Sequence, residues 1–214
     1  MSKTLSESAS KELLAAFGLP VPTEHIAADA EAAVAAAEDV GYPCVLKLCG
    51  DAIAHKTERN LVRLGLGSHE QVSVAATELL DAATDADGDV ALLVAPMIRS
   101  NREFIVGADR PDEFGPVVMF GVGGVLAEAV EDVVFRLVPL DATAAAAMLD
   151  ELRSQALLGP FRGEPAVDRV AMAQVIGAVA QAMQDRPEIL AIDVNPVLIA
   201  HGRPVAVDAL VELR

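Results

Sequence analysis

The stretch Pro43-Cys-Val-Leu-Lys47-Leu-Cys-Gly50-Asp-Ala-Ile-Ala-His55-Lys56-Thr57 is the most informative part of the chain. It predicts an apolar strand that carries Lys47 and ends at Gly50, followed by a loop that carries His55. A lysine on a buried strand is costly unless an anion meets it. A loop histidine can move charge or a phosphoryl group. The pairing indicates a phosphate site with a mobile nucleophile beside it.

Each of these two residues also has a plainer interpretation. Lys47 could extend its ammonium group to solvent from the end of the strand, and His55 could be an exposed loop histidine with no role. The hydrophobic neighbours in Val45-Leu-Lys-Leu48 favour a lysine that acts as a point charge on nucleotide phosphates. For His55, the residues alone leave both interpretations open.

Composition bounds the class of protein. With 214 residues and 53% hydrophobic content, the chain can bury one or two compact cores. Its longest apolar region, Val117 to Val130, is interrupted by glycines and is too short to cross a bilayer. The N-terminus has no apolar signal segment, so we expect a cytoplasmic protein. The net charge of -16 argues against binding to nucleic acid or anionic membranes.

The cysteines predict neither a disulfide nor a metal centre. Cys44 and Cys49 lie five residues apart on one predicted strand, so they point to opposite faces and cannot bridge each other. No Cys/His spacing in the chain fits a zinc site.

The chain up to about residue 98 predicts a helix followed by one small α+β layer. After the helix, the break at Pro20-Val-Pro22 leads into the order β-α-β-β-α-β. The expected elements are a helix over Ser6–Phe17, a strand near Thr23–Ala27, a helix capped by Asp29 and ended by Gly41, strands over Cys44–Leu48 and Leu61–Leu66, a helix from the capping box Ser68-His-Glu-Gln71 to about Ala83, and a strand over Val90–Met97.

The remaining residues predict a second α+β unit. Its expected elements are strands over Arg102–Ala108, Pro116–Phe120 and Asp132–Val138, helices after Asp141 and over Val167–Met183, and strands over Ile189–Val194, Val197–Ala200 and Val205–Leu210. The third strand places Val133, Phe135 and Leu137 on one face and Arg136 on the other. We therefore divide the chain into a lead-in at 1–22, a subdomain at 23–98 and a subdomain at 99–214, with a site expected in the cleft between the two lobes.

Two polar residues near the C-terminus predict a magnesium site. They lie in Ala191-Ile-Asp193-Val-Asn195-Pro196 and Pro204-Val-Ala-Val-Asp208, which the turn His201-Gly-Arg203 folds into a hairpin. A turn centred on Gly202 places Asn195 opposite position 209, and therefore close to Asp208. An amide oxygen and a carboxylate suit Mg²⁺, which completes its shell with phosphate and water. The alternative is that both are ordinary polar residues at a strand end.

Three weaker features lie on the second unit. Glu103 could bind a ribose hydroxyl or could simply face water. Arg136 could contact phosphate, because Asp132-Val-Val-Phe-Arg-Leu offers it no local charge partner, or it could be a surface arginine. The glycines from Gly121 to Gly124 could bring the backbone close to a ligand, although such turns are common.

Seven motifs in this order resemble those of a known family. They are Gly18-Leu-Pro-Val-Pro22, Val45-Leu-Lys47, His55-Lys-Thr-Glu58, Glu103-Phe-Ile-Val-Gly107, Phe114-Gly-Pro-Val-Val-Met-Phe-Gly-Val-Gly-Gly124, Phe135-Arg-Leu-Val-Pro139 and Asp193-Val-Asn-Pro196. The chain resembles the ATP-grasp β subunit of ADP-forming acyl-CoA (acetyl-CoA) synthetases, in the succinyl-CoA synthetase superfamily. The likeness covers about residues 10 to 212.

This resemblance implies an ATP-grasp fold of two α+β subdomains with the nucleotide between them. The implied reaction converts acyl-CoA, phosphate and ADP reversibly into the free acid, CoA and ATP. His55 would relay the phosphoryl group between a phosphohistidine on the partner and the nucleotide. Lys47 and Glu103 would hold ATP or ADP, the Val94–Met97 strand, with Ala95 and Met97, would meet adenine through its backbone, and Asn195 and Asp208 would hold Mg²⁺. The implied partner is a CoA-binding α subunit in an α₂β₂-type complex.

Three departures from the family pattern stand out. Arg59-Asn60 follows the His-Lys motif where relatives often carry glycines, which would stiffen that end of the loop. Ala95 stands where an amide or acid is usual. The CoA-binding and ligase domains of the α subunit are absent, so we expect the chain to need a partner. Two other functions stay open: a stand-alone ATP-grasp ligase that forms an acyl-phosphate directly, and a nucleotide-binding module without catalysis.

Overall fold

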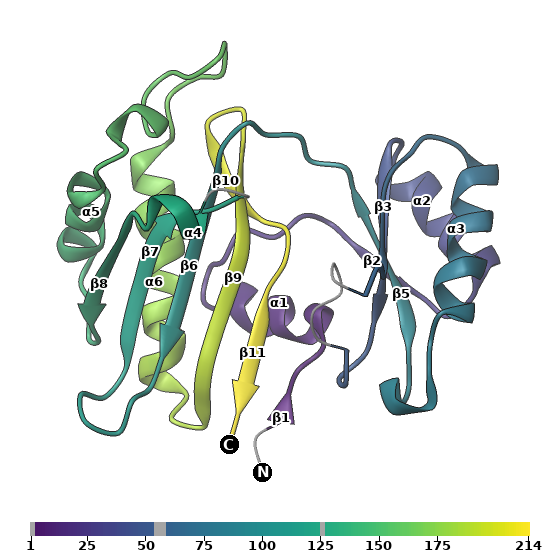
Figure 1. The fold of residues 1–214 in the computed structure, drawn as a ribbon, viewed down its shortest axis with the longest axis horizontal. Coiled ribbons are helices and arrows are strands. Elements are labelled where there is room, and N and C mark those ends of the chain that lie inside the picture. The colour runs from purple at the N-terminus through teal and green to yellow at the C-terminus, as the bar shows by residue number, and fades with distance from the viewer. Residues whose placement is uncertain (1–2, 54–58, 125–126) are drawn as a thin grey trace. The chain divides into compact units, whose positions relative to one another are not determined.

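The computed structural model describes all residues except 1–2, 54–58 and 125–126 (Figure 1). The chain divides into two compact units. The small unit comprises Thr4–Ala9 and Pro22–Met97, and the large unit comprises Lys3, Ser10–Val21 and Ile98–Arg214. The N-terminal segment is therefore shared between the two units, and the chain passes from one to the other after Met97.

The small unit is a four-stranded antiparallel sheet with helices packed on one face. The strand order is β2-β5-β3-β4, with β2 at His25–Ala27, β3 at Cys44–Cys49, β4 at Val62–Leu66 and β5 at Ala91–Pro96. Helices α2, Ala30–Val40, and α3, His69–Asp81, pack on this sheet, and a short 3₁₀ helix, η1, covers Asp85–Asp87. Cys44, Leu46 and Leu48 join the buried cluster under the helices, while Cys49 lies in a separate cluster with Leu93 and Ala95. Neither Cys44 nor Cys49 forms a disulfide bond.

Local signals in the sequence set the helix ends. The Asp29 side chain accepts a hydrogen bond from the Ala32 N–H at 2.9 Å, and Gly41 caps the other end of α2. Ser68 caps α3 by accepting from the Gln71 N–H at 3.3 Å. The predicted capping box is only half formed, because Gln71 Oε1 accepts from Gly67 N at 2.7 Å instead of from Ser68 N.

The large unit is built on a seven-stranded sheet in the described part of the chain. The order is β1-β11-β9-β6-β7-β8, with β10 also paired to β9. The strands are β1 at Lys3–Thr4, β6 at Glu103–Asp109, β7 at Val117–Val122, β8 at Val133–Leu137, β9 at Ile189–Ala200, β10 at Arg203–Ala206 and β11 at Leu210–Leu213. The helices are α1 at Glu7–Ala15, whose first turn belongs to the small unit, α4 at Ala127–Val130, α5 at Ala142–Glu151 and α6 at Arg169–Asp185, and a 3₁₀ turn covers Gln155–Leu157.

The core of the large unit lies between the sheet and α6, which runs behind β6 and β7 in Figure 1. Phe104 and Phe120 stack in this core with ring centroids 5.6 Å apart. The alternation predicted for β8 is present, but its apolar face is the exposed one: Phe135 is 55% and Leu137 59% exposed, whereas Val134 is buried. None of the helices in the described residues is long and apolar enough to cross a bilayer.

Candidate functional site

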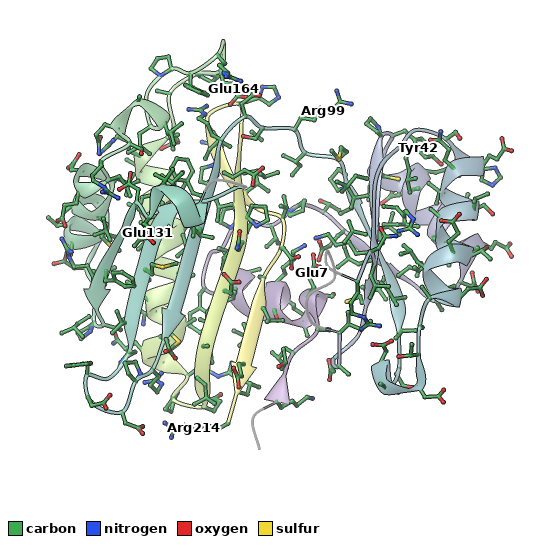
Figure 2. All side chains as sticks on the ribbon, in the orientation of Figure 1. Glu7, Tyr42, Arg99, Glu131, Glu164 and Arg214 are labelled. Carbon is green, nitrogen blue, oxygen red and sulfur yellow. The ribbon has the colours of Figure 1, made fainter. Side chains whose placement is uncertain are left out.

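Lys47 lies in the middle of β3 and is buried. Its cross-strand neighbours are Leu93 on β5 and Val62 on β4. The ammonium group is not extended to solvent: Lys47 Nζ donates to Glu7 Oε1 at 2.6 Å, and the side chains of the two residues are 10% and 0% exposed. Glu7 is labelled in Figure 2 and lies in the first turn of α1. The expected anion near Lys47 is therefore present in this structure as a carboxylate of the chain itself.

Some backbone groups at the end of β5 are already hydrogen-bonded to neighbouring residues of the small unit. Ala95 is buried and pairs with Val45. Met97 N–H donates to the Pro43 carbonyl at 3.0 Å, and Pro96 has no N–H. A contact from Met97 to adenine would therefore use its carbonyl group or its side chain. His55 and Lys56 lie outside the described residues.

Glu103 and the glycine loop form one cluster in the large unit. Gly123 N–H donates to the Glu103 carbonyl at 2.8 Å. A Cβ added to Gly123 would lie 3.1 Å from the Phe104 carbonyl carbon, and one added to Gly124 would lie 3.4 Å from Glu103 Oε2. Because Gly123 and Gly124 have no side chain, the loop packs closely on the start of β6. This packing holds the Glu103 carboxylate beside the loop.

A buried arginine next to Glu103 fixes the start of β6. The Arg102 guanidinium is fully buried and donates to Glu164 Oε2 at 3.1 Å. It also donates to the carbonyls of Gly159 and Pro165 at 3.0 and 2.7 Å. Glu164 is labelled in Figure 2. Because all of these partners are on one connection, Arg102 ties that connection to the strand that presents Glu103.

The hairpin that carries Asn195 and Asp208 has a register one residue different from the predicted one. Arg203 pairs with Ala200 and Ala206 with Val197, so the loop consists of His201 and Gly202. Both have positive φ, of 50° and 85°, which is the type I′ geometry of two-residue hairpins. The predicted turn was centred on Gly202, and the true centre lies between His201 and Gly202.

The corrected register brings the two predicted metal ligands opposite each other. Val207 N–H donates to the Pro196 carbonyl at 3.2 Å, and Leu210 pairs with Asp193. These contacts flank the position where Asn195 faces Asp208. The pairing of β6 with β9 shifts by one residue between Phe104 and Val106, beside the cis Asn195-Pro196 bond. Such a bulge re-aims side chains at the end of a ladder.

A second acid, Asp193, lies close to Asp208. Loss of surrounding water and the nearby negative charge of Asp208 raise the pKa of Asp193. The described residues contain no group of three or more His, Cys, Asp or Glu side chains that could hold a metal ion. The amide oxygen of Asn195 and the carboxylate of Asp208 are of the kind that Mg²⁺ takes, since this ion binds one or two protein oxygens and completes its shell with phosphate and water.

Arg136 differs from expectation because it has a charge partner. Its guanidinium forms an ion pair with Glu151 at the end of α5 and donates to the Phe135 carbonyl at 2.8 Å. Arg136 pairs with buried Val118, on the sheet face that carries the helices. The argument for a phosphate contact was the lack of a local charge partner, and the ion pair with Glu151 removes that argument.

The structure thus groups the predicted residues within each unit and adds three that the sequence argument missed. Lys47 and Ala95 share one sheet of the small unit. Glu103 and Asn195 share one sheet of the large unit, and Asp208 lies between its strands β10 and β11. The missed residues are Glu7, Asp87 and Arg102. Asp87 had a readable signal, the pattern Thr84-Asp-Ala-Asp87, which is a capping box in the structure. Glu7 had none, because its partner is 40 residues away.

Comparisons with known proteins give a consistent result. A family model described as an ATP-grasp domain matches residues 1–213. The chain is 34% identical over 211 residues to the acetate–CoA ligase [ADP-forming] I subunit beta of Pyrococcus furiosus, covering 97% of this chain and 91% of that protein.

Two solved structures of acetyl-coenzyme A synthetase 1 from Ca. Korarchaeum cryptofilum are also similar. One, in complex with coenzyme A and Ca-AMPCP, has a TM-score of 0.91 and 32% identity, over 99% of this chain and 94% of that chain. The other, with coenzyme A and Mg-AMPPCP, has a phosphohistidine segment that points towards the nucleotide binding site. It has a TM-score of 0.84 and 33% identity, over 99% of this chain and 93% of that chain.

Proposed function

We propose that this chain, which belongs to the ATP-grasp domain family, is the nucleotide-binding β subunit of an ADP-forming acyl-CoA ligase of the acetate–CoA type. The reaction is acyl-CoA, phosphate and ADP going reversibly to the acid, CoA and ATP. The observation that carries the proposal is the likeness to a β subunit over 97% of this chain and 91% of that protein. The match spans nearly the whole of both sequences.

In the proposed mechanism His55 carries the phosphoryl group. The His55 ring, phosphorylated on one nitrogen and protonated on the other, loses its phosphorus–nitrogen bond as a terminal oxygen of ADP forms the new phosphorus–oxygen bond. The histidine is left as neutral imidazole and the product is ATP. Transfer of this kind mainly requires in-line positioning and neutralisation of charge on the phosphate oxygens.

The described residues supply the positioning and the charge. Lys47 places an ammonium group on a rigid central strand, where it meets phosphate oxygens. Asn195 and Asp208 would hold Mg²⁺, which supplies neutralisation of the phosphate charge when bound. Glu103, fixed between the glycine loop and the Arg102 network, would accept hydrogen bonds from ribose hydroxyls. Ala95 and Met97 supply backbone and apolar contacts to the base.

The partner in this proposal is a CoA-binding α subunit. The similar Pyrococcus protein is named as a subunit beta, which implies a second subunit. We propose an α₂β₂-type assembly in the cytoplasm, in which the α subunit makes the acyl-phosphate and hands its phosphoryl group to His55.

The test is phosphorylation of the isolated chain from the ATP side. The purified protein is incubated with Mg²⁺ and γ-labelled ATP, and the label is tested for the acid-labile, base-stable behaviour of phosphohistidine. We expect label on the wild type and on His69→Ala, a control in the exposed first turn of α3, and none on His55→Ala. Label that persists in His55→Ala contradicts the relay. Turnover of a carboxylic acid without label and without a partner would instead identify a ligase that activates the acid directly.

A further inference from the structure

We propose that Asp87 is a positioning residue that fixes both ends of the segment carrying His55. This inference rests on the proposed role of His55 as the phosphoryl relay. The described residues on either side of 54–58 contact the same short turn, Thr84–Asp89, and Asp87 lies at its centre. All of these residues belong to the small unit.

The C-terminal end of the segment is held by a bidentate ion pair between Arg59 and Asp87. Arg59 Nη1 donates to Asp87 Oδ1 at 2.6 Å, and Arg59 Nη2 donates to Asp87 Oδ2 at 2.9 Å. The Asp87 side chain is 3% exposed. Its Oδ2 also accepts from the N–H and the hydroxyl of Thr84, both at 2.8 Å. The carboxylate is therefore fixed by its own turn before Arg59 binds it, and such paired bonds hold a guanidinium in one plane.

The near end of the segment packs against the same turn through its backbone. A Cβ added to Gly50 would lie 2.8 Å from the Asp89 carbonyl oxygen and 3.6 Å from that of Asp87. No L side chain fits at the shorter of these distances. Gly50 also begins a tight turn, in which its carbonyl accepts a hydrogen bond from Ile53 N–H at 3.1 Å. A glycine is required here by the close approach of the 84–89 turn.

The ends of the segment are also joined to each other and to the N-terminal helix. Leu48 N–H donates to the Leu61 carbonyl at 3.0 Å, which pairs the last part of β3 with the residue before β4. Asp51 Oδ1 accepts from Ser6 N–H at 3.1 Å. Asn60 has a φ of 56°, the left-handed conformation that glycine adopts most easily. Asn60 thus keeps a turn that a glycine would make, while Arg59 adds the ion pair.

This arrangement has a direct consequence for the relay. Gly50 and Arg59, described residues on either side of the segment, both contact one turn, so that turn sets the points at which the segment joins the rest of the small unit. In this proposal Arg59 and Asp87 act on the relay through these points of attachment, as positioning residues. An error of about 1 Å in such positioning costs about 100-fold in rate.

The test separates positioning from simple stabilisation of the fold. The variants are Arg59→Ala, Arg59→Lys and Asp87→Asn, with Asp85→Asn as a control in the same turn and Arg169→Ala as a control for an exposed arginine pair. For each variant, the single-turnover rate of His55 labelling by Mg-ATP is measured, together with the Kd for Mg-ATP. Amide hydrogen exchange of residues 48–53, 59–62 and 84–89 is followed by mass spectrometry.

We expect Arg59→Ala and Asp87→Asn to slow labelling about 10- to 100-fold while the Kd changes less than about 2-fold. Arg59→Lys keeps the charge but not the paired geometry, and should fall in between. Exchange should accelerate at both 48–53 and 59–62 in the Asp87 variant. The controls should match the wild type in every measurement.

Two results overturn the inference. One is acceleration of exchange only at 84–89 in Asp87→Asn, which makes Asp87 a residue of its own turn alone. The other is a normal labelling rate in Arg59→Ala and Asp87→Asn although the segment ends exchange faster. Absence of His55 label on the wild type contradicts the proposed function, and the exchange data then decide separately whether Asp87 fixes the two ends.

Discussion

Neutralising Glu7 should destabilise the small unit, because Glu7 and Lys47 form a buried ion pair. At 2.6 Å and an effective dielectric constant of about 20, the attraction between two unit charges is about 6 kcal/mol. Desolvation of the two groups offsets much of this, since their side chains are 0% and 10% exposed. Measured losses on removing one partner of a buried pair are about 3–5 kcal/mol. Glu7→Gln keeps the shape, so we expect about 3 kcal/mol, and about 4 kcal/mol for Lys47→Met.

The double variant Glu7→Gln, Lys47→Met distinguishes an ion pair from two separate effects. Replacing both charges removes the desolvation penalty together with the attraction, so the double variant should lie within about 1 kcal/mol of the wild type. If the two losses were independent, they would add to about 7 kcal/mol. The cycle therefore measures the coupling between the two side chains directly.

The chain offers a probe that reports on the small unit alone. Tyr42 is the single tyrosine and there is no tryptophan. Tyr42, labelled in Figure 2, lies just before β3 in the small unit. Urea unfolding followed by tyrosine fluorescence therefore reports on the unit that contains the ion pair. With a slope of about 1.5 kcal/mol per molar urea, the midpoint for Glu7→Gln should fall by about 2 M.

Two outcomes would refute this reasoning. If Glu7→Gln and Lys47→Met both keep the wild-type midpoint, the pair adds nothing to stability. If the double variant shows the sum of the two losses, the residues act independently and the 2.6 Å contact carries no coupling. Asp39→Asn is a matched control, because Asp39 pairs with His25 in the same unit with both side chains well exposed, and it should stay within about 0.5 kcal/mol of the wild type.

Three further predictions follow from the site and the large unit. Lys47→Ala should weaken Mg-ATP binding at least about 10-fold in a calorimetric titration, and Lys56→Ala less than about 3-fold, so equal losses would contradict the ranking. Asp208→Asn should raise the Mg²⁺ concentration needed for half-maximal nucleotide binding about 10-fold, and an unchanged requirement would remove Asp208 from the metal site. Burial alone would raise the pKa of Asp132, but hydrogen bonds from Arg153 and Ser154 and the Arg153 charge hold it below 3.8. The stability that ionised Asp132 contributes to the fold is therefore present above pH 3.8 and is lost as the pH falls further. Asp132→Asn should lower the free energy of unfolding by about 2 kcal/mol at pH 7 and by less below pH 3.8. A loss that does not depend on pH would refute this.

Features set by neighbouring residues could be predicted from the sequence. Asp29 caps α2, Ser68 caps α3 and Gly41 ends α2, because each of these signals acts within one helical turn. Strands β3 and β5 were found from their apolar runs. The predicted hairpin register was wrong by one residue, because His201 adopts a positive φ that a histidine in the sequence does not indicate.

Features that depend on contacts distant in sequence could not be predicted. The partner of Lys47 lies 40 residues away in a helix that the pattern marks only as amphipathic. The partner of Arg136 lies on α5, 15 residues further along the chain, so the residues around Arg136 do not indicate it. The exposed apolar face of β8 has the same alternation as a buried face, and alternation alone does not say which side meets the core.

The charges of the proposed site imply a strict dependence on magnesium. Lys47 is the one cation among the proposed nucleotide and metal residues in the described part of the chain, and Glu7 already neutralises much of its charge. Glu103, Asp193 and Asp208 add negative charge, and the whole chain carries -16. A nucleotide polyphosphate is itself strongly anionic, so these residues alone would repel it. We therefore expect that free ATP binds at least about 100-fold more weakly than Mg-ATP, because only the metal ion reverses the sign of the field around Asp208. Equal affinity for the two forms in a titration with EDTA would show that the phosphates are held elsewhere.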